Sequence, residues 1–181
     1  LPNPSTIRIG ITQAGQLVLH QGATDIGQGS NTVITQIAAQ ALGVSVADFA
    51  LIGPDTALSP DAGKTSASRQ TFVSGRAAMA AGLALRAELV RLANGDGPIA
   101  FAPGAVQVGA RRIDLRALPL DGFGYAVSAE QSYDPPTQAL DANGQGAPYA
   151  VYGYGAQMVE LQVDAQLGTV RLLKITAAHD V

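Results

Sequence analysis

Residues 7–42, IRIGITQAGQLVLHQGATDIGQGSNTVITQIAAQAL, change from the hydrophobic period of a strand to that of a helix. The stretch begins with apolar isoleucines that alternate with Arg8 and Gly10. The alternation is interrupted at Ala14-Gly15 and resumes at Leu17-Val-Leu19. Two short alternating runs joined through a glycine are typical of a β-hairpin.

The second half of this stretch predicts a glycine-rich loop followed by a helix. The loop covers residues 22–29, and Ser30 or Asn31 then offers an N-cap. Apolar residues recur at intervals of three and four up to Leu42, and Gly43 is the residue type that commonly follows a helix end. A helix is therefore expected from about residue 30 to residue 42.

The remaining sequence adds one long helix and several short strands. Residues 49–52 predict a strand, and a helix is expected from about Gln70 to Asn94, where Asn-Gly-Asp-Gly-Pro ends it. Further strands are expected within 99–120 and around Tyr125–Ala129. The apolar stripe of the long helix is expected to be buried and includes Phe72, Met79, Leu83 and Val90. Two helices packed on mixed sheets, without strict alternation of strand and helix, indicate an α+β fold.

The chain is expected to hold one α+β unit and the start of another. The first unit covers residues 1–133, and the Pro/Gly/Asn-rich segment 134–148 is predicted to be a linker. Residues 149–181 contain an alternating hairpin and would begin the second unit, so two similar subdomains are possible on this pattern. Chance similarity between two hairpins is an equally good explanation. The apolar end at Val181 suggests a piece of a longer polypeptide.

Composition excludes several classes of protein. Apolar residues make up 47 % and charged residues 14 %, which excludes intrinsic disorder, and no apolar run reaches the length of a membrane-spanning helix. A net charge of −3 gives no electrostatic basis for binding nucleic acid or acidic lipid. With no cysteine and two histidines, the chain cannot supply thiolate ligands to iron–sulfur clusters or zinc.

A phosphate-binding P-loop is the first motif to test, because Ala62-Gly-Lys-Thr-Ser66 lies between a predicted strand and a predicted helix. That motif needs a glycine five residues before Gly63, where this chain has Leu58. Pro60 also removes one of the amide donors that the phosphate cradle needs. The sequence therefore argues against a P-loop.

Two other loop motifs fail in a similar way. Residues 141–146 resemble the first half of a calcium loop, but its twelfth position, which should be a bidentate glutamate, is Tyr152. The Gly27-Gln-Gly29 segment lacks the third glycine of a dinucleotide fingerprint, and Thr32 stands in its place. A polar turn and a hairpin-to-helix loop explain these segments better.

Two loops share the character of an anion-binding site. Gly27-Gln28-Gly29 leads into the first helix, and residues 65–71, TSASRQT, lead into the second. Both loops combine small residues with the free amides at a positive helix end, and Arg69 adds a fixed charge with bidentate geometry. Helix capping alone would explain only one or two of these hydroxyls. The residues thus predict one anion site built from both loops.

At these loops the sequence resembles the molybdopterin-binding subunit of the xanthine dehydrogenase / aldehyde oxidoreductase family, the molybdenum hydroxylases. The resemblance is carried by DIGQGSNT at 25–32 and by SPDAGKTSASRQTFVSG at 59–75. It continues through YGAQMVELQVD at 154–164 to AHDV at 178–181. The motifs occur in order along nearly the whole chain.

The resemblance implies a cofactor-binding segment. Molybdopterin with molybdenum, in its cytosine dinucleotide form in bacteria, would be wrapped by the glycine–glutamine turn and the serine-rich loop. The cofactor-binding residues implied in this way are Gly27, Gln28, Gly29, Ala67, Ser68, Arg69 and Gln70. No metal ligand is implied among the side chains of this chain.

The resemblance also implies an activity that this chain would share in. The family oxidises an aldehyde or N-heteroaromatic carbon with oxygen taken from water, and a glutamate in a Gly-x-Gly-Glu motif is its catalytic base. Neither Glu88, Glu130 nor Glu160 follows such a motif. The partners implied are the remaining parts of the molybdopterin subunit together with iron–sulfur and FAD subunits, in the cytoplasm. A non-enzymatic folding or subunit-contact module is the alternative.

We expect the 181-residue chain to have no hydroxylase activity, because loss of a general base alone typically costs a factor of about 10²–10⁴. A dye-coupled assay with aldehydes and purines measures this activity. Turnover by the purified chain would contradict the expectation.

We also expect the chain to self-associate through apolar surface left uncovered. Sedimentation at high concentration measures its oligomeric state. A persistent monomer would argue against this expectation.

Overall fold

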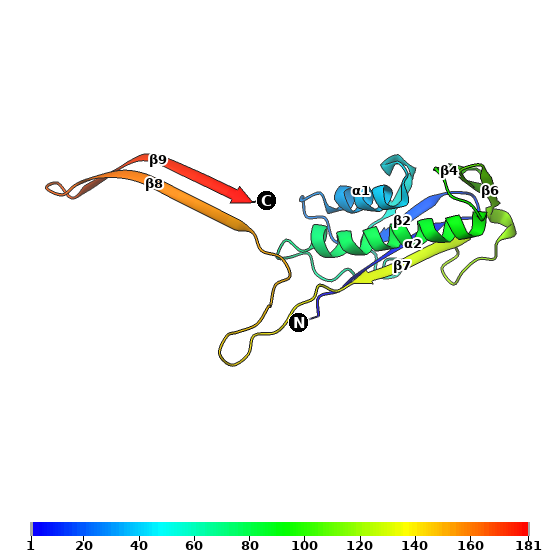
Figure 1. Cartoon of the computed structure of the whole chain (residues 1–181), viewed down its shortest axis with the longest axis horizontal. Helices are drawn as coiled ribbons and strands as arrows, with labels where there is room; N and C mark the ends of the chain where they lie inside the picture. The colour runs from blue at the N-terminus through cyan, green and yellow to red at the C-terminus, as the bar shows by residue number, and fades with distance from the viewer. Residues whose placement is uncertain (1, 181) are drawn as a thin grey trace. The chain divides into compact units, whose positions relative to one another are not determined.

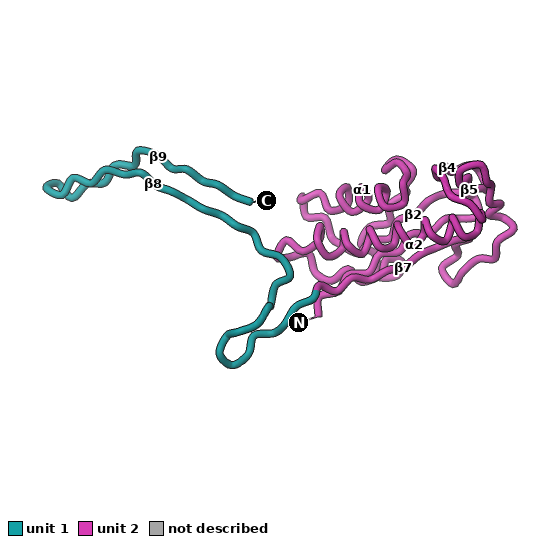
Figure 2. Tube along the Cα trace, in the orientation of Figure 1, with its two compact units in different colours: residues 1, 136–181 teal, residues 2–135 magenta. Residues whose placement is uncertain are grey.

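The computed structural model describes residues 2–180, which divide into two compact units between Pro135 and Pro136. Figure 2 colours the two units separately, and each is described here by itself. The first unit contains helices and mixed sheets, so the predicted α+β class is confirmed. None of the helices in residues 2–180 has the length and hydropathy needed to cross a membrane.

The main sheet of the first unit has four strands. They are β1 (Ser5–Ile11), β2 (Leu17–Gln21), β3 (Phe49–Ile52) and β7 (Val127–Tyr133), in the spatial order β3-β2-β1-β7. The predicted hairpin is confirmed by the antiparallel pairing of β1 with β2, and β7 pairs antiparallel with the other edge of β1. β3 pairs parallel with β2. The three isoleucines of β1 are fully buried.

Two helices pack with this sheet (Figure 1). α1 spans Ser30–Leu42 and ends at Gly43, which has a left-handed φ of 83° as the sequence predicts. α2 spans Gly75–Ala93, packs against β1 and β7, and also contacts α1. The expected start of the second helix at Gln70 is corrected, because Gln70–Ser74 forms one π-helical turn, η2, before α2 begins.

The buried stripe expected on the second helix is also corrected. Met79 and Leu83 are 39 % and 51 % exposed. The buried face of α2 consists instead of small residues with two leucines, namely Gly75, Ala77, Ala78, Ala81, Gly82, Leu85 and Leu89. Large side chains do not fit on this face, because α1 lies so close that a Cβ on Gly82 would be 2.9 Å from the Ala38 carbonyl oxygen.

The contacts between the helices show that they run in the same direction. Gly75, the first residue of α2, lies against Ile37 in the middle of α1, and further along both helices the Arg86 guanidinium donates to the Leu42 carbonyl. β2 and β3 are parallel as well. The loop from β2 to α1 and the loop from β3 to η2 therefore both begin at the same end of the sheet, where the carboxyl ends of β2 and β3 lie. Ligand sites in α/β structures commonly lie at such an end.

Smaller elements complete the first unit. A three-stranded antiparallel sheet contains β4 (Ile99–Ala102), β5 (Ala105–Val108) and β6 (Arg111–Asp114). There are two 3₁₀ turns: η1 (Val46–Asp48) lies between α1 and β3, and η3 (Leu115–Ala117) lies between β6 and β7. Val106, Val108 and Leu115 join the same apolar core as β1 and α2.

The second unit is a long hairpin preceded by a loop. β8 (Tyr154–Asp164) pairs antiparallel with β9 (Thr169–Asp180), with a register shift between Glu160 and Leu161. Within the preceding loop, Gln138 and Ala147 form an isolated antiparallel bridge. The proposal that 149–181 begins a second α+β unit stays a prediction.

The contact between α1 and α2 gives a test of the fold. Replacing Gly82 with leucine forces a side chain against the backbone of α1, and overpacking of this kind typically costs about 1–3 kcal/mol. Urea-induced unfolding is expected to show a correspondingly lower free energy of unfolding. Ala87→Leu, on the exposed side of the same helix, is the matched control and should change little. Equal stability of the two variants would contradict the packing described.

Candidate functional site

The glycine turn before α1 is organised by one carboxylate. Asp25 Oδ1 accepts hydrogen bonds from the backbone N–H groups of Gly27, at 2.9 Å, and Gly29, at 3.3 Å. Its Oδ2 accepts from the N–H of Asn31 at 3.1 Å. Gly27 and Gly29 have φ values of 101° and 80°, a left-handed region in which other residues are strained. Aspartate and glycine together therefore fix the turn.

This arrangement corrects the expected cap of α1. Gly29 occupies the N-cap position, and Asp25 supplies the acceptor that Ser30 or Asn31 was expected to supply. Ser30 Oγ is buried and has no hydrogen-bond partner within residues 2–180. Hydrogen bonds from the Gly27 and Asn31 amides hold the pKa of Asp25 below its ordinary value. The amides of this turn thus already bind an anion, the carboxylate of Asp25.

The side chain of Gln28 is also used within the turn. Its Oε1 accepts from the N–H of Ile26 at 2.6 Å, and its Nε2 donates to the Thr24 carbonyl at 3.2 Å. The same Thr24 carbonyl accepts a 2.9 Å hydrogen bond from the Thr65 hydroxyl. Thr65 therefore joins the glycine turn to the serine-rich loop, 41 residues further along the chain.

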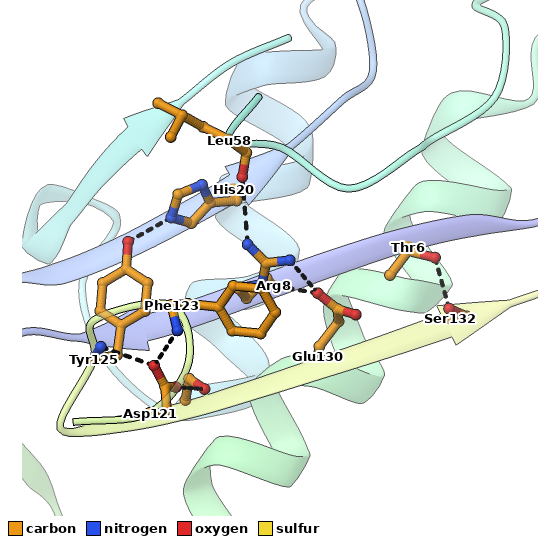
Figure 3. Close-up of polar contacts among 10 residues, drawn as sticks. Thr6, Arg8, His20, Leu58, Asp121, Phe123, Tyr125, Glu130 and Ser132 are labelled. Atoms are coloured by element: carbon orange, nitrogen blue, oxygen red, sulfur yellow. Dashed lines mark hydrogen bonds and ion pairs between the residues drawn. The ribbon is translucent and has the colours of Figure 1, made fainter. Parts of the chain in front are cut away.

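The backbone of residues 53–64, which precede the serine-rich loop, packs closely against the end of β2. A Cβ on Gly22 would lie 2.5 Å from the Pro60 carbonyl oxygen, so only glycine fits at this contact. The long loop is held on the sheet as well, since Thr6 N–H donates to the Asp61 carbonyl at 2.9 Å. Arg8 donates to the Leu58 carbonyl at 3.3 Å (Figure 3). The path of residues 53–64 is thus set by close contacts to β1 and to the end of β2.

Figure 3 shows a polar group on this face of the sheet that the sequence analysis did not single out. His20 Nε2 lies 2.5 Å from the Tyr125 hydroxyl, and Arg8 forms an ion pair with Glu130 at 2.7 Å. Burial lowers the pKa of His20, and the charge of Arg8 lowers it further. The imidazole is therefore neutral at pH 7, and this group anchors the sheet face.

The serine-rich loop contains two residues with unusual backbone geometry. Ala67 and Ser68 have φ values of 53° and 54°, in the left-handed region. Each such residue costs about 1–2 kcal/mol when it carries a Cβ. Backbone strain of this kind persists only where surrounding contacts determine the conformation. Arg69 and Gln70, directly after this pair, provide such contacts.

Arg69 is buried, and its guanidinium binds backbone carbonyl groups. Nη1 donates to the carbonyls of Ala62 and Lys64, and Nη2 donates to those of Asn3 and Pro4, both at 2.9 Å. The expectation that this side chain offers a bidentate fork to phosphate is therefore corrected, because both ends of the fork are occupied by main-chain oxygens.

Gln70 belongs to a buried hydrogen-bond chain. Its Nε2 donates to the Thr65 hydroxyl at 3.1 Å, and its Oε1 accepts from Ser74 Oγ. Ser74 Oγ is in turn 2.7 Å from Ser5 Oγ at the start of β1. The amide of Gln70 thus connects the sheet to the loop.

A cavity of about 380 Å³ lies between the two loops. Among the predicted site residues it is lined by Gln28 and by the run Ala67–Gln70, while Gly27 and Gly29 are not part of its lining. Its other walls are Ile26, Thr65, Ser66 and Thr71. The structure therefore brings the two predicted loops together, with the first loop contributing its side chains rather than its glycines.

A larger cavity, of about 520 Å³, lies between α2 and β7 and contains none of the predicted residues. Its charged groups include Glu88 and Arg91, which are paired with each other at 2.6 Å. Within residues 2–180, no group of three or more acidic or histidine side chains could hold a metal ion. The cavity between the loops, which the predicted residues line, is therefore the better candidate site.

A family model described as the molybdopterin cofactor-binding domain matches residues 1–181. The chain belongs to this family. It lies within the wider xanthine dehydrogenase and aldehyde oxidoreductase group, as the resemblance of its motifs implied.

Two curated relatives and one solved structure define the similarity. The gamma subunit of the 6-hydroxypseudooxynicotine dehydrogenase complex from Paenarthrobacter nicotinovorans is 28 % identical over 94 % of this chain and 22 % of that protein. The xanthine dehydrogenase molybdenum-binding subunit of Escherichia coli O157:H7 is 30 % identical over 96 % of this chain and 23 % of that protein. The aldehyde oxidoreductase of Desulfovibrio desulfuricans has a TM-score of 0.68 at 23 % identity, over 99 % of this chain and 18 % of that chain.

These matches show the fold and the family of a cofactor-binding domain. The chain spans about a fifth of the length of the relatives that it matches. The named relatives are dehydrogenases and oxidoreductases that work with molybdenum or belong to multi-subunit complexes. The chain therefore corresponds to a cofactor-binding domain within these longer relatives.

The role of Asp25 can be tested by removing its carboxylate or protonating it. Because hydrogen bonds lower its pKa, its stabilising effect is fully present above the ordinary pKa of an aspartate and is lost as the pH falls through the lowered pKa. Asp25→Ala is expected to abolish amide-exchange protection at Gly27 and Asn31 at every pH, as measured by NMR.

Asp141 is the matched control, because its Oδ1 accepts from Asn143 and Gln145 in a similar turn of the second unit. Asp141→Ala should leave the amides of Gly27 and Asn31 unchanged. Normal protection of these amides in Asp25→Ala would show that the glycines alone hold the turn.

Proposed function

We propose that the cavity between the glycine turn and the serine-rich loop binds the phosphate-bearing part of molybdopterin. The observation that supports this most directly is the shared cavity itself, which joins Gln28 to residues 65–71 although they are far apart in sequence. A family of cofactor-binding domains gives the cavity its ligand class. The cytosine dinucleotide form of the cofactor is part of the same proposal.

The groups that line the cavity fit an anionic ligand. Among the residues that the structure describes, the hydroxyls of Ser66, Ser68 and Thr71 are exposed and form no side-chain hydrogen bond with the protein. Hydroxyl groups next to the beginning of a helix suit phosphate oxygens. The buried guanidinium of Arg69 adds a positive charge beneath the same wall. The donor set therefore suits phosphate better than an apolar ligand.

The site residues predicted from the sequence take different parts in this proposal. Ser68 would donate from its hydroxyl, and Ala67 and Ser68 would offer the backbone of their left-handed turn. Gln28 would contact the cofactor along the opposite wall, and Gly27 and Gly29 would set the path of that wall. Gln70 would act through Thr65, since both ends of its amide are bonded within the protein.

The whole protein is proposed to oxidise an aldehyde or N-heteroaromatic carbon, with water as the source of oxygen. The bound molybdenum cofactor supplies the two-electron redox chemistry. The described residues that line the cavity would bind and orient that group, and none of them is a carboxylate. Glu88 and Glu130 are paired with arginines. The base would come from outside this chain. Iron–sulfur and FAD partners, and a cytoplasmic location, complete the proposal.

One observation favours the alternative of a non-enzymatic module. The side chains of Asp25, Gln28 and Gln70 all have internal hydrogen-bond partners, as expected of loops that serve folding alone. The free hydroxyls of Ser66, Ser68 and Thr71 distinguish the two functions, since folding does not use them.

Inorganic pyrophosphate provides a direct probe of the cavity. In an NMR titration of the 181-residue chain, we expect shifts confined to Gln28 and residues 65–71. Changing Ser66 and Ser68 to alanine together should weaken binding about tenfold or more, because a hydrogen bond to a charged group contributes about 1.5–3 kcal/mol. Thr56→Ala, in an exposed part of the long loop, is the control. Shifts elsewhere, or none, would favour the non-enzymatic module.

A further inference from the structure

We propose that Arg69 is a positioning residue of the cofactor cavity, whose guanidinium holds the Ala67–Ser68 turn in place without touching the ligand. The inference rests on the proposed function for its ligand class, but its structural half concerns the protein alone. It reverses the role that the sequence pattern assigns to this arginine.

The N–H groups of Arg69 that could grip a phosphate are already bonded to the protein. A guanidinium has five N–H groups, two on each Nη and one on Nε. The two of Nη1 are used by the carbonyls of Ala62 and Lys64, and the two of Nη2 by those of Asn3 and Pro4. The remaining Nε is buried and has no partner within residues 2–180. A bidentate grip on phosphate needs two parallel N–H groups, and Arg69 does not have two to offer.

The four carbonyls that Arg69 binds lie next to the start of β1 and next to the serine-rich loop. Asn3 and Pro4 lie directly before β1, and Ala62 and Lys64 lie directly before the serine-rich loop. The bond from Arg69 to the Lys64 carbonyl closes a short ring of chain that contains Ala67 and Ser68. Both residues have positive φ values and need external contacts to hold them there. Arg69 supplies these contacts from the residue that follows.

Gly63 provides an independent sign that this region is shaped around the guanidinium. Its φ is 65°, and a Cβ at this position would lie 2.9 Å from Nη1 and 3.1 Å from Nη2 of Arg69. The backbone therefore lies directly against the guanidinium, and a side chain at residue 63 would push the guanidinium away. Gly63 is a second site at which the same contact can be disturbed, with the arginine and its charge retained.

The charges around Arg69 are consistent with its role in holding the loop. Within residues 2–180, Arg69 has no carboxylate at ion-pair distance. Burial lowers its pKa, and the more distant charges of Asp61 and Asp134 raise it, while an arginine stays protonated throughout. Its charge favours an anion in the cavity through space, in addition to fixing the wall.

Two variants of the 181-residue chain separate positioning from direct contact. Arg69→Lys keeps the charge but has a single nitrogen, which cannot reach all four carbonyls. Gly63→Ala keeps the arginine and displaces it. The N–H of Arg69 donates to the Ser66 carbonyl, and the N–H of Val73 donates to the Arg69 carbonyl. We expect each variant to lower amide-exchange protection at Arg69 and Val73 at least tenfold in the ligand-free protein. Each should also weaken binding of inorganic pyrophosphate about tenfold. Arg112→Lys, at an exposed position of β6, should change neither quantity.

Three results would overturn the proposal. Unchanged exchange in Arg69→Lys would show that the turn does not need the guanidinium. Weaker binding in Arg69→Lys with normal exchange, together with normal binding in Gly63→Ala, would show direct contact between Arg69 and the anion. A parallel loss of protection at β1 and α1 would show global destabilisation, which urea unfolding of both variants also measures.

The two proposals fail separately. If the wild-type chain does not bind pyrophosphate, the proposed function fails, while exchange in the ligand-free variants still tests whether Arg69 holds the turn. If Arg69→Lys does not fold, Gly63→Ala provides both readouts. Normal exchange in Gly63→Ala would then contradict the role of the guanidinium.

Discussion

The cavity depends on the bonding of side chains to main-chain atoms in two loops that have little regular structure. Buried carbonyl and amide groups need hydrogen-bond partners, and loops cannot provide them through strand or helix pairing. Here Asp25 binds the amides of the glycine turn, Arg69 binds the carbonyls around the serine-rich loop, and Thr65 joins the two. The polar atoms of these side chains are thus used to hold the backbone of the loops in place.

The position of the loops follows from the topology of the first unit. β2 and β3 are parallel, and the helices that follow them run in the same direction. Both loops must therefore emerge at one end of the sheet, whatever their sequences. The contact of Gly75 with Ile37 then holds the beginning of α2 against α1. The fold supplies the meeting place, and the loop residues supply its chemistry.

The regular elements of this frame could be predicted from the sequence, while the roles of several loop side chains could not. Alternation and glycine positions predict the β1–β2 hairpin and α1 correctly. The prediction that Met79 and Leu83 are buried was wrong. Hydrophobicity alone favours large residues for a buried face, while close helix packing selects glycine and alanine. The role of Asp25 was accessible from its spacing to the glycines, as aspartate commonly binds amides two residues on. The partners of Arg69 lie up to 66 residues away, so no local pattern reveals them.

The distribution of charge around the cavity indicates where an anion would bind. Asp25 places a carboxylate on the glycine turn, and its bonds use amides that a phosphate would otherwise need. Repulsion and competition therefore disfavour an anion at that turn. The opposite wall has the free hydroxyls of Ser66 and Ser68 above the buried charge of Arg69. A phosphate would bind against this wall, which leaves the glycine turn to face the uncharged part of the ligand. Under the proposed function, the two loops would therefore bind different parts of the ligand according to charge.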